Sequence, residues 1–467
     1  AGLRLTPKDL FEHQTIAALA AVAGRSELPE ADQGIVTGPA PLTPIQHWFF
    51  ERERVSPHHF NQGHMVELVD GVDTDALRGA LMALLAHHDA LRLRFHRGPD
   101  GWTQENAAVN PVDILEAHSL STMDADVMEG IADAAQSSFN LETGPLLRAV
   151  LYRFADGSAP RLLLVAHHLV VDGVSWRILL DDLDVAYHQV MRGERIDLGA
   201  KTTSFQAWSR GLSAFVESGG LDHELSIWEA ATGDGELPVD RTASTVGSDP
   251  AAVSVELGTE DTDALLRGAP TAYRTRINDV LLAALARAVS RWTGDERVVI
   301  ALEGHGREDI LNDVDLSRTV GWFTSMFPVA LTVPTGDWRT MVRGIRKQLR
   351  AIPGNGFGYG ALRYLGSLRH EGVPPRISFN YLGQFDSRAD DADNSLFGET
   401  HSVIGRDHDP ADRGDHLIDI VGEVGDGKLT FAWYYQPDIH DAATIEAVAA
   451  DFAEALRAIA DDCRRAL

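Results

Sequence analysis

Two adjacent histidines at the end of an apolar run are the first residues whose types and spacing suggest chemistry. His167 and His168 follow the run at 161–166 and lead into Leu169-Val170-Val171-Asp172-Gly173. Because side chains alternate along a strand, we expect one imidazole to line a site and the other to pack. Asp172 could orient an imidazole or pair with an arginine to hold the loop. The alternative is a structural strand-end histidine followed by a capping aspartate.

A metal site is the rival interpretation, since histidine and aspartate side chains can ligate zinc. Adjacent histidines on a strand point apart, however, and the sequence holds no second ligand cluster with metal-like spacing. We therefore predict no metal. His87 and His88 form another adjacent pair, at the end of an amphipathic helical pattern, and we expect them to be structural.

A second chemical cluster follows another apolar run, at 297–302. Glu303-Gly304-His305-Gly306-Arg307-Glu308 places two glycines between potential acid/base groups, which permits a tight backbone and open access. A carboxylate at a strand end in a partly apolar cleft can have a raised pKa and transfer protons. Glu303 is preferred over Glu308 because it lies nearer the strand end. The alternative is a turn in which Arg307 and Glu308 form surface ion pairs.

Two later segments could border the same cleft. Residues Pro353 to Gly360 are rich in glycine but lack the Gly-Lys-Ser/Thr ending of a phosphate loop. They predict a mobile or closely packed loop near a ligand. Residues Phe379 to Phe385 predict a strand with two polar side chains that could face a cleft.

Alternating helices and strands must position these groups. We expect a helix leading into a strand over 74–97, a central strand at 161–166, and a helix from about 176 that ends near Gly193. Residues 211–250 are rich in Gly, Ser, Asp and Thr and predict a subdomain boundary. A helix at about 277–292 and a strand at 297–302 follow. This order predicts an α/β or α+β fold.

Composition narrows the classes of partner and compartment. The formal net charge of −28 repels phosphate backbones and anionic membrane surfaces, so we expect neither nucleic acid nor membrane as a partner. The single cysteine, Cys463, excludes an intrachain disulfide and fits a cytoplasmic location. No apolar run reaches the length of a membrane helix. The chain begins without an initiator methionine, so we expect it to be a segment of a longer protein.

Taken together, these segments resemble the epimerization domain of nonribosomal peptide synthetases, over roughly residues 35–460. The matching stretches run in the family's order and begin with Pro44 to Phe49 and His167 to Trp176. They continue with Glu303 to Glu308, Arg318 to Thr324, the loop Pro353 to Gly360, and Asn380 to Gln384. The His-His motif is shared with condensation domains, whereas Glu-Gly-His-Gly-Arg-Glu and Asn-Tyr-Leu-Gly-Gln are more specific to epimerization.

The resemblance implies an α/β (α+β) fold of two chloramphenicol-acetyltransferase-like subdomains in a V-shaped pseudo-dimer. We expect the N-terminal subdomain at 41–215 and the C-terminal subdomain at 216–467, with a channel between them. Residues 1–24 look like the last helices of a carrier protein, with the helical unit at 3–23, and 25–40 reads as a linker. The serine that would carry phosphopantetheine is not in this chain.

The resemblance also implies the chemistry. The expected reaction is L-to-D epimerization of an aminoacyl or peptidyl thioester by proton transfer, with no cofactor held by this chain. The phosphopantetheine arm would come from an upstream peptidyl carrier protein, and a downstream condensation domain is a further expected partner. His168 and Glu303 are the expected acid/base pair, and Tyr381, Glu303 or a water completes the exchange. The expected supporting residues are His167, Asp172, Trp176, Asn380, Arg307 and Glu308.

The residues also argue against other epimerase chemistries. A pyridoxal enzyme needs a Schiff-base lysine, and the lysines Lys8, Lys201, Lys347 and Lys428 all lie outside the motifs. A racemase with two cysteines is excluded by the lone Cys463. Two alternatives stay open at this point: a condensation domain that forms a peptide bond, and a noncatalytic module that only docks carrier proteins.

Overall fold

The computed structural model describes residues 3–4, 24–25, 31–52, 54–231, 235–242, 250–369, 374–384, 395–401, 405–412 and 414–466. Most of the expected carrier-protein fragment therefore lies outside the described residues. Only its ends are described, where β1 (Leu3–Arg4) pairs with β2 (Gly24–Arg25) as strands rather than helix.

The first half of the chain builds a mixed helix and sheet layer. Its sheet has the order β14-β4-β9-β8-β7, and a small separate sheet has the order β3-β6-β5. The elements are β3 (Gly38–Ala40), α3 (Pro44–Glu51), β4 (Asn61–Leu68), α4 (Thr74–His87), η1 (Asp89–Arg92), β5 (Leu93–Gly98), β6 (Gly101–Asn106), β7 (Leu115–Leu120), α5 (Ala125–Gln136), β8 (Leu147–Phe154), β9 (Arg161–His167), η2 (His168–Val170), α6 (Gly173–Met191), α7 (Phe205–Glu217), η3 (Asp222–Glu224) and α8 (Leu225–Ala231).

The second half builds a sheet in the order β10-β16-β15-β13-β11-β12. Its elements are β10 (Ala251–Leu257), α9 (Thr259–Asp263), the π-helical turn η4 (Ala264–Gly268), α10 (Ala269–Tyr273), α11 (Ile277–Thr293), β11 (Arg297–Gly304), β12 (Ser325–Thr332), α12 (Trp338–Leu349), η5 (Pro353–Gly356), α13 (Phe357–Tyr364), β13 (Ile377–Gln384), β14 (Phe397–His401), β15 (Ile418–Gly425), β16 (Lys428–Tyr435) and α14 (Ala442–Ala466).

Local sequence explains the elements that position the candidate site. Strand β9 is buried on both faces from Leu162 onward, and β4 and β8 cover its two edges in the sheet, which suits its apolar sequence. Helix α6 begins after Asp172, whose side chain accepts a hydrogen bond from the backbone amide of Ser175. Helix α11 is buried over most of its length and ends at Gly294, which adopts the left-handed conformation favoured at such ends.

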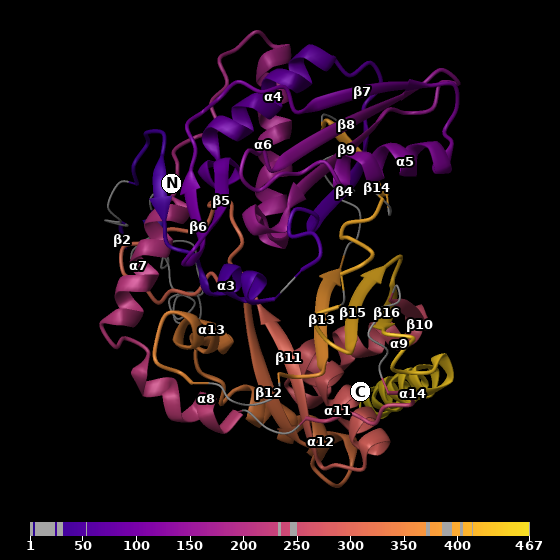
Figure 1. Ribbon diagram of the computed structural model, residues 1–467. Helices are drawn as coiled ribbons and strands as arrows, with labels where there is room; N and C mark the ends of the chain where they lie inside the picture. Colours follow the sequence, from indigo (N-terminus) through magenta and orange to yellow (C-terminus); the bar gives the residue numbers. More distant parts are fainter. Residues whose placement is uncertain are drawn as a thin grey trace.

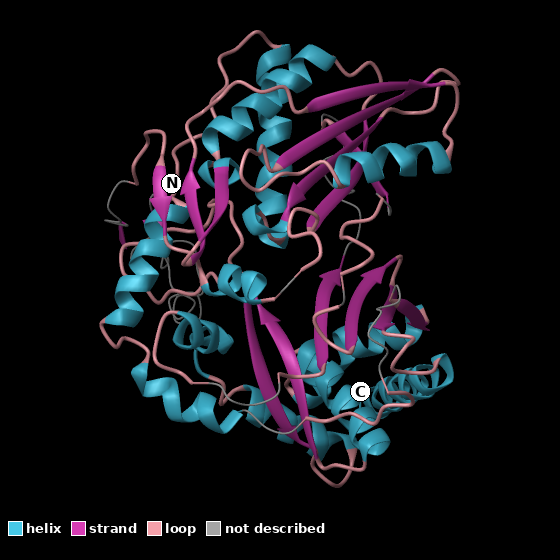
Figure 2. Ribbon diagram, viewed as in Figure 1, coloured by secondary structure: helices cyan, strands magenta, loops and turns pink. Residues whose placement is uncertain are grey.

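The two halves lie on either side of the middle of the molecule. Figure 1 shows β11 running toward α3 and the first half, and Figure 2 shows helices gathered on the outer side of the strands of the second half. The halves are also joined through their sheets, because β14 comes late in the chain yet pairs with β4 of the first half. A division at 215/216 falls in the last turn of α7, which leads from one half to the other.

The expected helices and strands at 74–97, 161–166, 176–193, 277–292 and 297–302 are confirmed. The segment at 211–250 is more regular than expected, because most of its first part is helical, in α7 and α8. Among the described residues, every helix is too short or too polar to span a bilayer.

The expectation of a loop from Pro353 to Gly360 was wrong in part. Residues 353–356 form η5, and α13 begins at Phe357. The segment is closely packed: a Cβ at Gly356 would lie 2.1 Å from Phe327, and one at Gly358 would lie 1.9 Å from Glu224. Its glycines therefore serve close packing against the second-half sheet and against Glu224 of η3.

Candidate active site

His168 lies just past the end of β9 and is held at both ring nitrogens. Its Nδ1 lies 2.9 Å from the carbonyl oxygen of Val171, and its Nε2 lies 3.0 Å from the amide nitrogen of Gln62 on β4. The carbonyl can only accept, so Nδ1 must carry a proton and donate it. In the neutral imidazole, the lone pair then lies on Nε2.

Trp176 fixes the orientation of the Gln62 amide. The indole nitrogen of Trp176 lies 3.1 Å from the Gln62 side-chain oxygen. Because an indole N–H can only donate, the amide oxygen must face Trp176 and the amide NH₂ must face His168. The chain Trp176–Gln62–His168 thus independently requires a lone pair on Nε2.

Two aromatic rings pack against the imidazole of His168. The Phe60 ring stacks on it with centroids 5.5 Å apart, and the Trp322 ring lies 4.2 Å away. This burial lowers the pKa of His168 below its ordinary value, while the carboxylates of Asp172 and Asp407 act in the opposite direction. His168 is therefore predominantly neutral at neutral pH, in agreement with its hydrogen bonds.

His167 points away from His168 and packs in the core, as the strand alternation predicts. It is fully buried, its Nε2 lies 2.9 Å from the carbonyl of Pro57, and its Nδ1 accepts a hydrogen bond from the backbone of Leu169. Burial lowers the pKa of His167 to about 3. His167 therefore supports the strand end and does not line a cleft.

Asp172 pairs with an arginine, one of the two alternatives that its sequence position suggested. Its carboxylate accepts hydrogen bonds from Arg307 at 3.1 and 3.2 Å, and from the backbone amide of Phe323 at 3.1 Å. The Arg307 guanidinium lies over the Phe323 ring at 4.0 Å and also donates to the carbonyl of Thr319. The Asp172–Arg307 pair is almost buried and joins α6 of the first half to the second half.

Glu303 lies at the end of β11, on the face of the sheet that carries Asn380. The Asn380 amide donates to the Glu303 carboxylate at 2.9 Å. In the antiparallel pair of β11 and β12, Met326 lies directly opposite Glu303, so their side chains share this face. Figure 1 shows β11 running toward the middle of the molecule, where β9 also ends.

Burial raises the pKa of Glu303 to about 7, and the carboxylates of Asp415 and Asp419 act in the same direction, while His416 opposes them. The side chain keeps substantial contact with solvent. The carboxyl group thus lies against protein groups on one side and stays accessible to solvent. A carboxyl group with this pKa exchanges protons readily near neutral pH.

One short segment contacts both candidate groups. Trp322 packs on His168, and Met326 pairs with Glu303 only four residues later. Four residues of extended chain span at most about 14 Å, so the backbone positions that contact the two groups lie within that distance of each other.

A group of charged residues near Glu303 was not found from the sequence. His416 hydrogen-bonds Asp419 at 2.9 Å, and Asp415 forms ion pairs of 3.1 Å with both Arg52 and Arg54. These residues lie before and within β15 and just after α3, so only the fold brings them together. The Asp-His pair at 415–416 was the available signal.

Gln62 was also missed. Its role depends on the register of β4 against β9, in which Asn61 pairs with His167 and Gln62 with Ala166. The available signal was a pair of polar residues, Asn61-Gln62, at the start of an otherwise half-buried strand.

The structure does not place Tyr381 with Glu303. Strand alternation sends Tyr381 to the face opposite Asn380, where it packs against the hydrophobic core with Phe379. The expected catalytic role of Tyr381 therefore has no geometric support.

Glu308 contacts other residues than Glu303 does. It accepts a hydrogen bond from Asn355 at 3.1 Å and lies 3.3 Å from His305.

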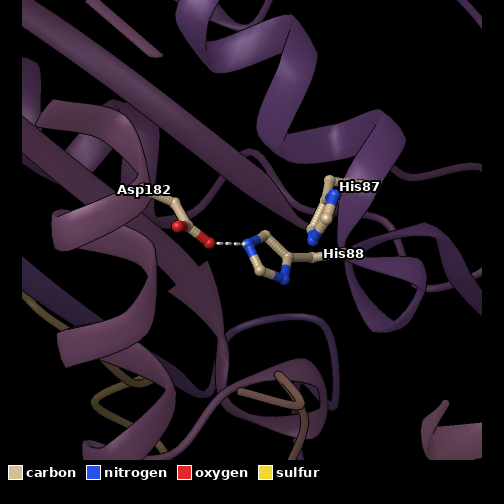
Figure 3. A group of neighbouring side chains, drawn as sticks. All are labelled: His87, His88 and Asp182. Atoms are coloured by element: carbon tan, nitrogen blue, oxygen red, sulfur yellow. Dashed lines mark hydrogen bonds and ion pairs between the residues drawn. The ribbon is translucent and has the colours of Figure 1, made fainter. Parts of the chain in front are cut away.

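Figure 3 shows a separate cluster, formed by His87, His88 and Asp182. His88 lies 2.9 Å from one oxygen of Asp182, and Arg318 binds the other oxygen. Burial lowers the pKa of His87 to about 4, and the neighbouring His88 and the positive charge of Lys201 act in the same direction. Positive charge opposes a bound cation, so this geometry favours a structural junction between α4, α6 and the second half.

Comparison with known proteins shows the family of this chain. Residues 36–467 match the condensation domain family. The chain is 44% identical to part of a linear gramicidin synthase of Brevibacillus parabrevis, covering 98% of this chain and 6% of that protein. It is 37% identical to part of surfactin synthase subunit 1 of Bacillus subtilis, covering 99% of this chain and 13% of that protein. The chain thus spans a small fraction of these relatives.

Solved structures also resemble this chain. The epimerization domain from the third module of tyrocidine synthetase B superposes with a TM-score of 0.85 at 36% identity, covering 94% of this chain and 99% of that one. The X-domain from teicoplanin biosynthesis superposes with a TM-score of 0.74 at 18% identity, a likeness of fold alone. The expected mixed fold of two acetyltransferase-like halves is confirmed, and the chain belongs to the condensation-domain family.

Proposed function

We propose that this chain is an epimerization domain that inverts the α-carbon of an aminoacyl or peptidyl thioester. The substrate is tethered through phosphopantetheine to an upstream peptidyl carrier protein, and the chain holds no cofactor of its own. A downstream condensation domain receives the product. Similarity to the tyrocidine synthetase epimerization domain over nearly the whole chain supports this proposal.

The reaction is a pair of proton transfers at one carbon. A base removes the α-proton, and the electron pair of the C–H bond delocalises onto the thioester oxygen as an enolate. An acid on the opposite face then returns a proton to the carbon, and the inverted thioester results. Two groups with pKa values near the working pH suit this exchange.

His168 and Glu303 are the pair that we assign to these roles. The Nε2 lone pair of neutral His168 can accept a proton, and Glu303, with a pKa of about 7, can donate or accept one. Because Nε2 has only one lone pair, the Gln62 amide must give way when His168 receives a proton. Asn380 positions the Glu303 carboxylate, and Asp172 and Arg307 hold the two halves in place.

The observation that carries the proposal is the placement of an imidazole and a carboxyl group of raised pKa on opposite halves, joined through the segment Trp322 to Met326. A condensation domain also uses the His-His motif, but it does not require a second proton-transfer group on the other side. The raised pKa of Glu303 therefore favours epimerization.

The test supplies the purified chain with a carrier protein loaded with an L-aminoacyl group. The released amino acid is then analysed by chiral chromatography, with and without a second loaded carrier. We expect a mixture of L and D forms without the second carrier. Retained L configuration with a peptide formed on adding the second carrier would show condensation. Binding of the carrier with neither product would leave only a docking role and contradict the proposal.

A further inference from the structure

A pocket lies beside the candidate active site, between α3, β12 and α13. The empty space inside and in front of it, open solvent included, is about 710 Å³. Most of its wall is aromatic or apolar, with Trp48, Phe327 and Tyr359 among the lining residues. A wall of this kind is typical of pockets that bury an apolar group of a ligand.

The pocket adjoins Glu303 through the sheet. Its wall includes Ala301, which precedes Glu303 by two residues and so shares its face of β11, and Met326, which lies directly opposite Glu303. His416, whose charge acts on Glu303, is a third wall residue. A group bound to Glu303 therefore lies next to the Met326 side of the pocket.

The pocket also adjoins His168. Trp48 lines it and packs edge-on against Trp322, with centroids 6.3 Å apart, and Trp322 in turn lies against His168. The pocket is thus flanked by the neighbours of both groups that we assign to the α-carbon.

The charged groups of the pocket wall are already paired. Arg52 forms an ion pair with Asp415 at 3.1 Å, and Arg363 forms one with Glu51 at 3.0 Å. His416 is hydrogen-bonded to Asp419. An additional charged substituent would find no opposite charge of its own among these groups, whereas an uncharged apolar one would bury its surface favourably.

We propose that this pocket receives the side chain of the amino acid under epimerization and selects aromatic and large aliphatic side chains. The inference rests on the proposed function, since it requires the α-carbon to lie between His168 and Glu303. Anchoring the side chain there would keep the α-carbon at the midpoint while its proton is exchanged.

The test compares carrier proteins loaded with phenylalanine, leucine, alanine or aspartate, in wild type and in Met326→Trp and Met326→Ala. We expect wild type to invert phenylalanine and leucine with a kcat/KM about 10- to 100-fold above that for alanine or aspartate. Met326→Trp, which fills the pocket, should lower kcat/KM for phenylalanine and leucine by a larger factor than kcat/KM for alanine, and so remove this advantage. Met326→Ala should keep the preference for the aromatic substrate.

The outcomes separate the two proposals. Wild type that inverts all four substrates equally, or Met326→Trp that lowers every rate by the same factor, would overturn the pocket assignment and leave the proposed function intact. Wild type that inverts none of the four would contradict the proposed function itself. Thermal unfolding of each variant controls for folding, and Met326→Ala still tests the preference if the larger residue destabilises the chain.

Discussion

His168 and Glu303 are held in contrasting ways on the two sides of the site. The imidazole is fixed at both nitrogens, by Val171 and Gln62, and packs against two aromatic rings. The carboxyl group accepts a hydrogen bond from Asn380 and stays open to solvent. The first half therefore supplies a group of defined tautomer, and the second half supplies a group whose proton is exchangeable at neutral pH.

The contrast follows from how each group is buried. Burial lowers the pKa of the histidine and raises that of the glutamate, because it disfavours the charged form of each. Near neutral pH His168 is therefore predominantly neutral and can act as a base, while Glu303, with a pKa of about 7, is present in both its protonated and its ionised form. A pair of this kind can take a proton from one face of a carbon and return one to the other.

The largest expected effect is loss of inversion when either group is removed. His168→Ala and Glu303→Gln should each lower the rate of inversion by about 10² to 10⁴-fold, because each removes one general acid/base. The rate is measured by chiral chromatography from both L- and D-loaded carriers. Glu308→Gln, which alters the contact with Asn355, is the matched control and should stay within about tenfold. A loss below about 10²-fold in Glu303→Gln would contradict the assignment.

Next in size is the effect of the pair that joins the halves. Asp172→Ala should lower the free energy of unfolding by about 3 to 5 kcal/mol, because it leaves the Arg307 guanidinium buried without its carboxylate. Asp172→Asn keeps the helix cap, so its free energy of unfolding should fall by a smaller amount. Urea unfolding, followed by tryptophan fluorescence, measures both variants. Equal stability of Asp172→Ala and wild type would show that the pair does not hold the halves together.

A smaller effect concerns the pH dependence of Glu303. Where Glu303 acts as the base it must be ionised, so kcat/KM in that direction should rise with pH through about 7. The Asn380 hydrogen bond favours the ionised form, so Asn380→Ala should raise the pKa of Glu303 and move this limb to higher pH. Asn355→Ala, which touches Glu308 instead, should leave the limb in place. A limb that moves to lower pH in Asn380→Ala would contradict the role of the amide.

The smallest effect tests the fixed tautomer of His168. In Gln62→Glu a carboxylate replaces the amide beside Nε2 and favours the imidazolium, so the pKa of His168 should rise. Gln62→Leu removes the hydrogen-bond donor without adding charge and should raise the pKa of His168 by a smaller amount. The carboxylates of Asp172 and Asp407 are present in both variants, so the comparison isolates position 62. NMR titration of the His168 ring reports the change, and an unaltered pKa in Gln62→Glu would show that the amide does not contact Nε2.

The sequence predicted the parts of this molecule that local patterns determine. The apolar run before His167 specified a buried strand, and alternation predicted that His167 and His168 would diverge. The position of Glu303 at the end of its apolar run similarly indicated a side chain presented at a strand end. These features depend on neighbours within a few residues along the chain.

Contacts that depend on strand register or on the meeting of the halves were not predictable. Gln62 reaches His168 only because β4 pairs antiparallel with β9. Tyr381 was included because it belongs to the same motif as Asn380, although alternation along β13 places the two side chains on opposite faces. Alternation is visible in the sequence, so this error was avoidable, whereas the position of Gln62 required the fold.

The most direct test of the central claim is deuterium wash-in from D₂O at the α-carbon, measured by mass spectrometry with L- and D-loaded carriers. Wild type should incorporate solvent deuterium into both the L- and the D-loaded substrate. If His168 and Glu303 act from opposite faces, His168→Ala and Glu303→Gln should each retain wash-in with only one enantiomer, and that enantiomer should differ between the two variants. Loss of wash-in with both enantiomers in one variant, and full retention in the other, would mean that a single group does all the proton transfer and would contradict the account.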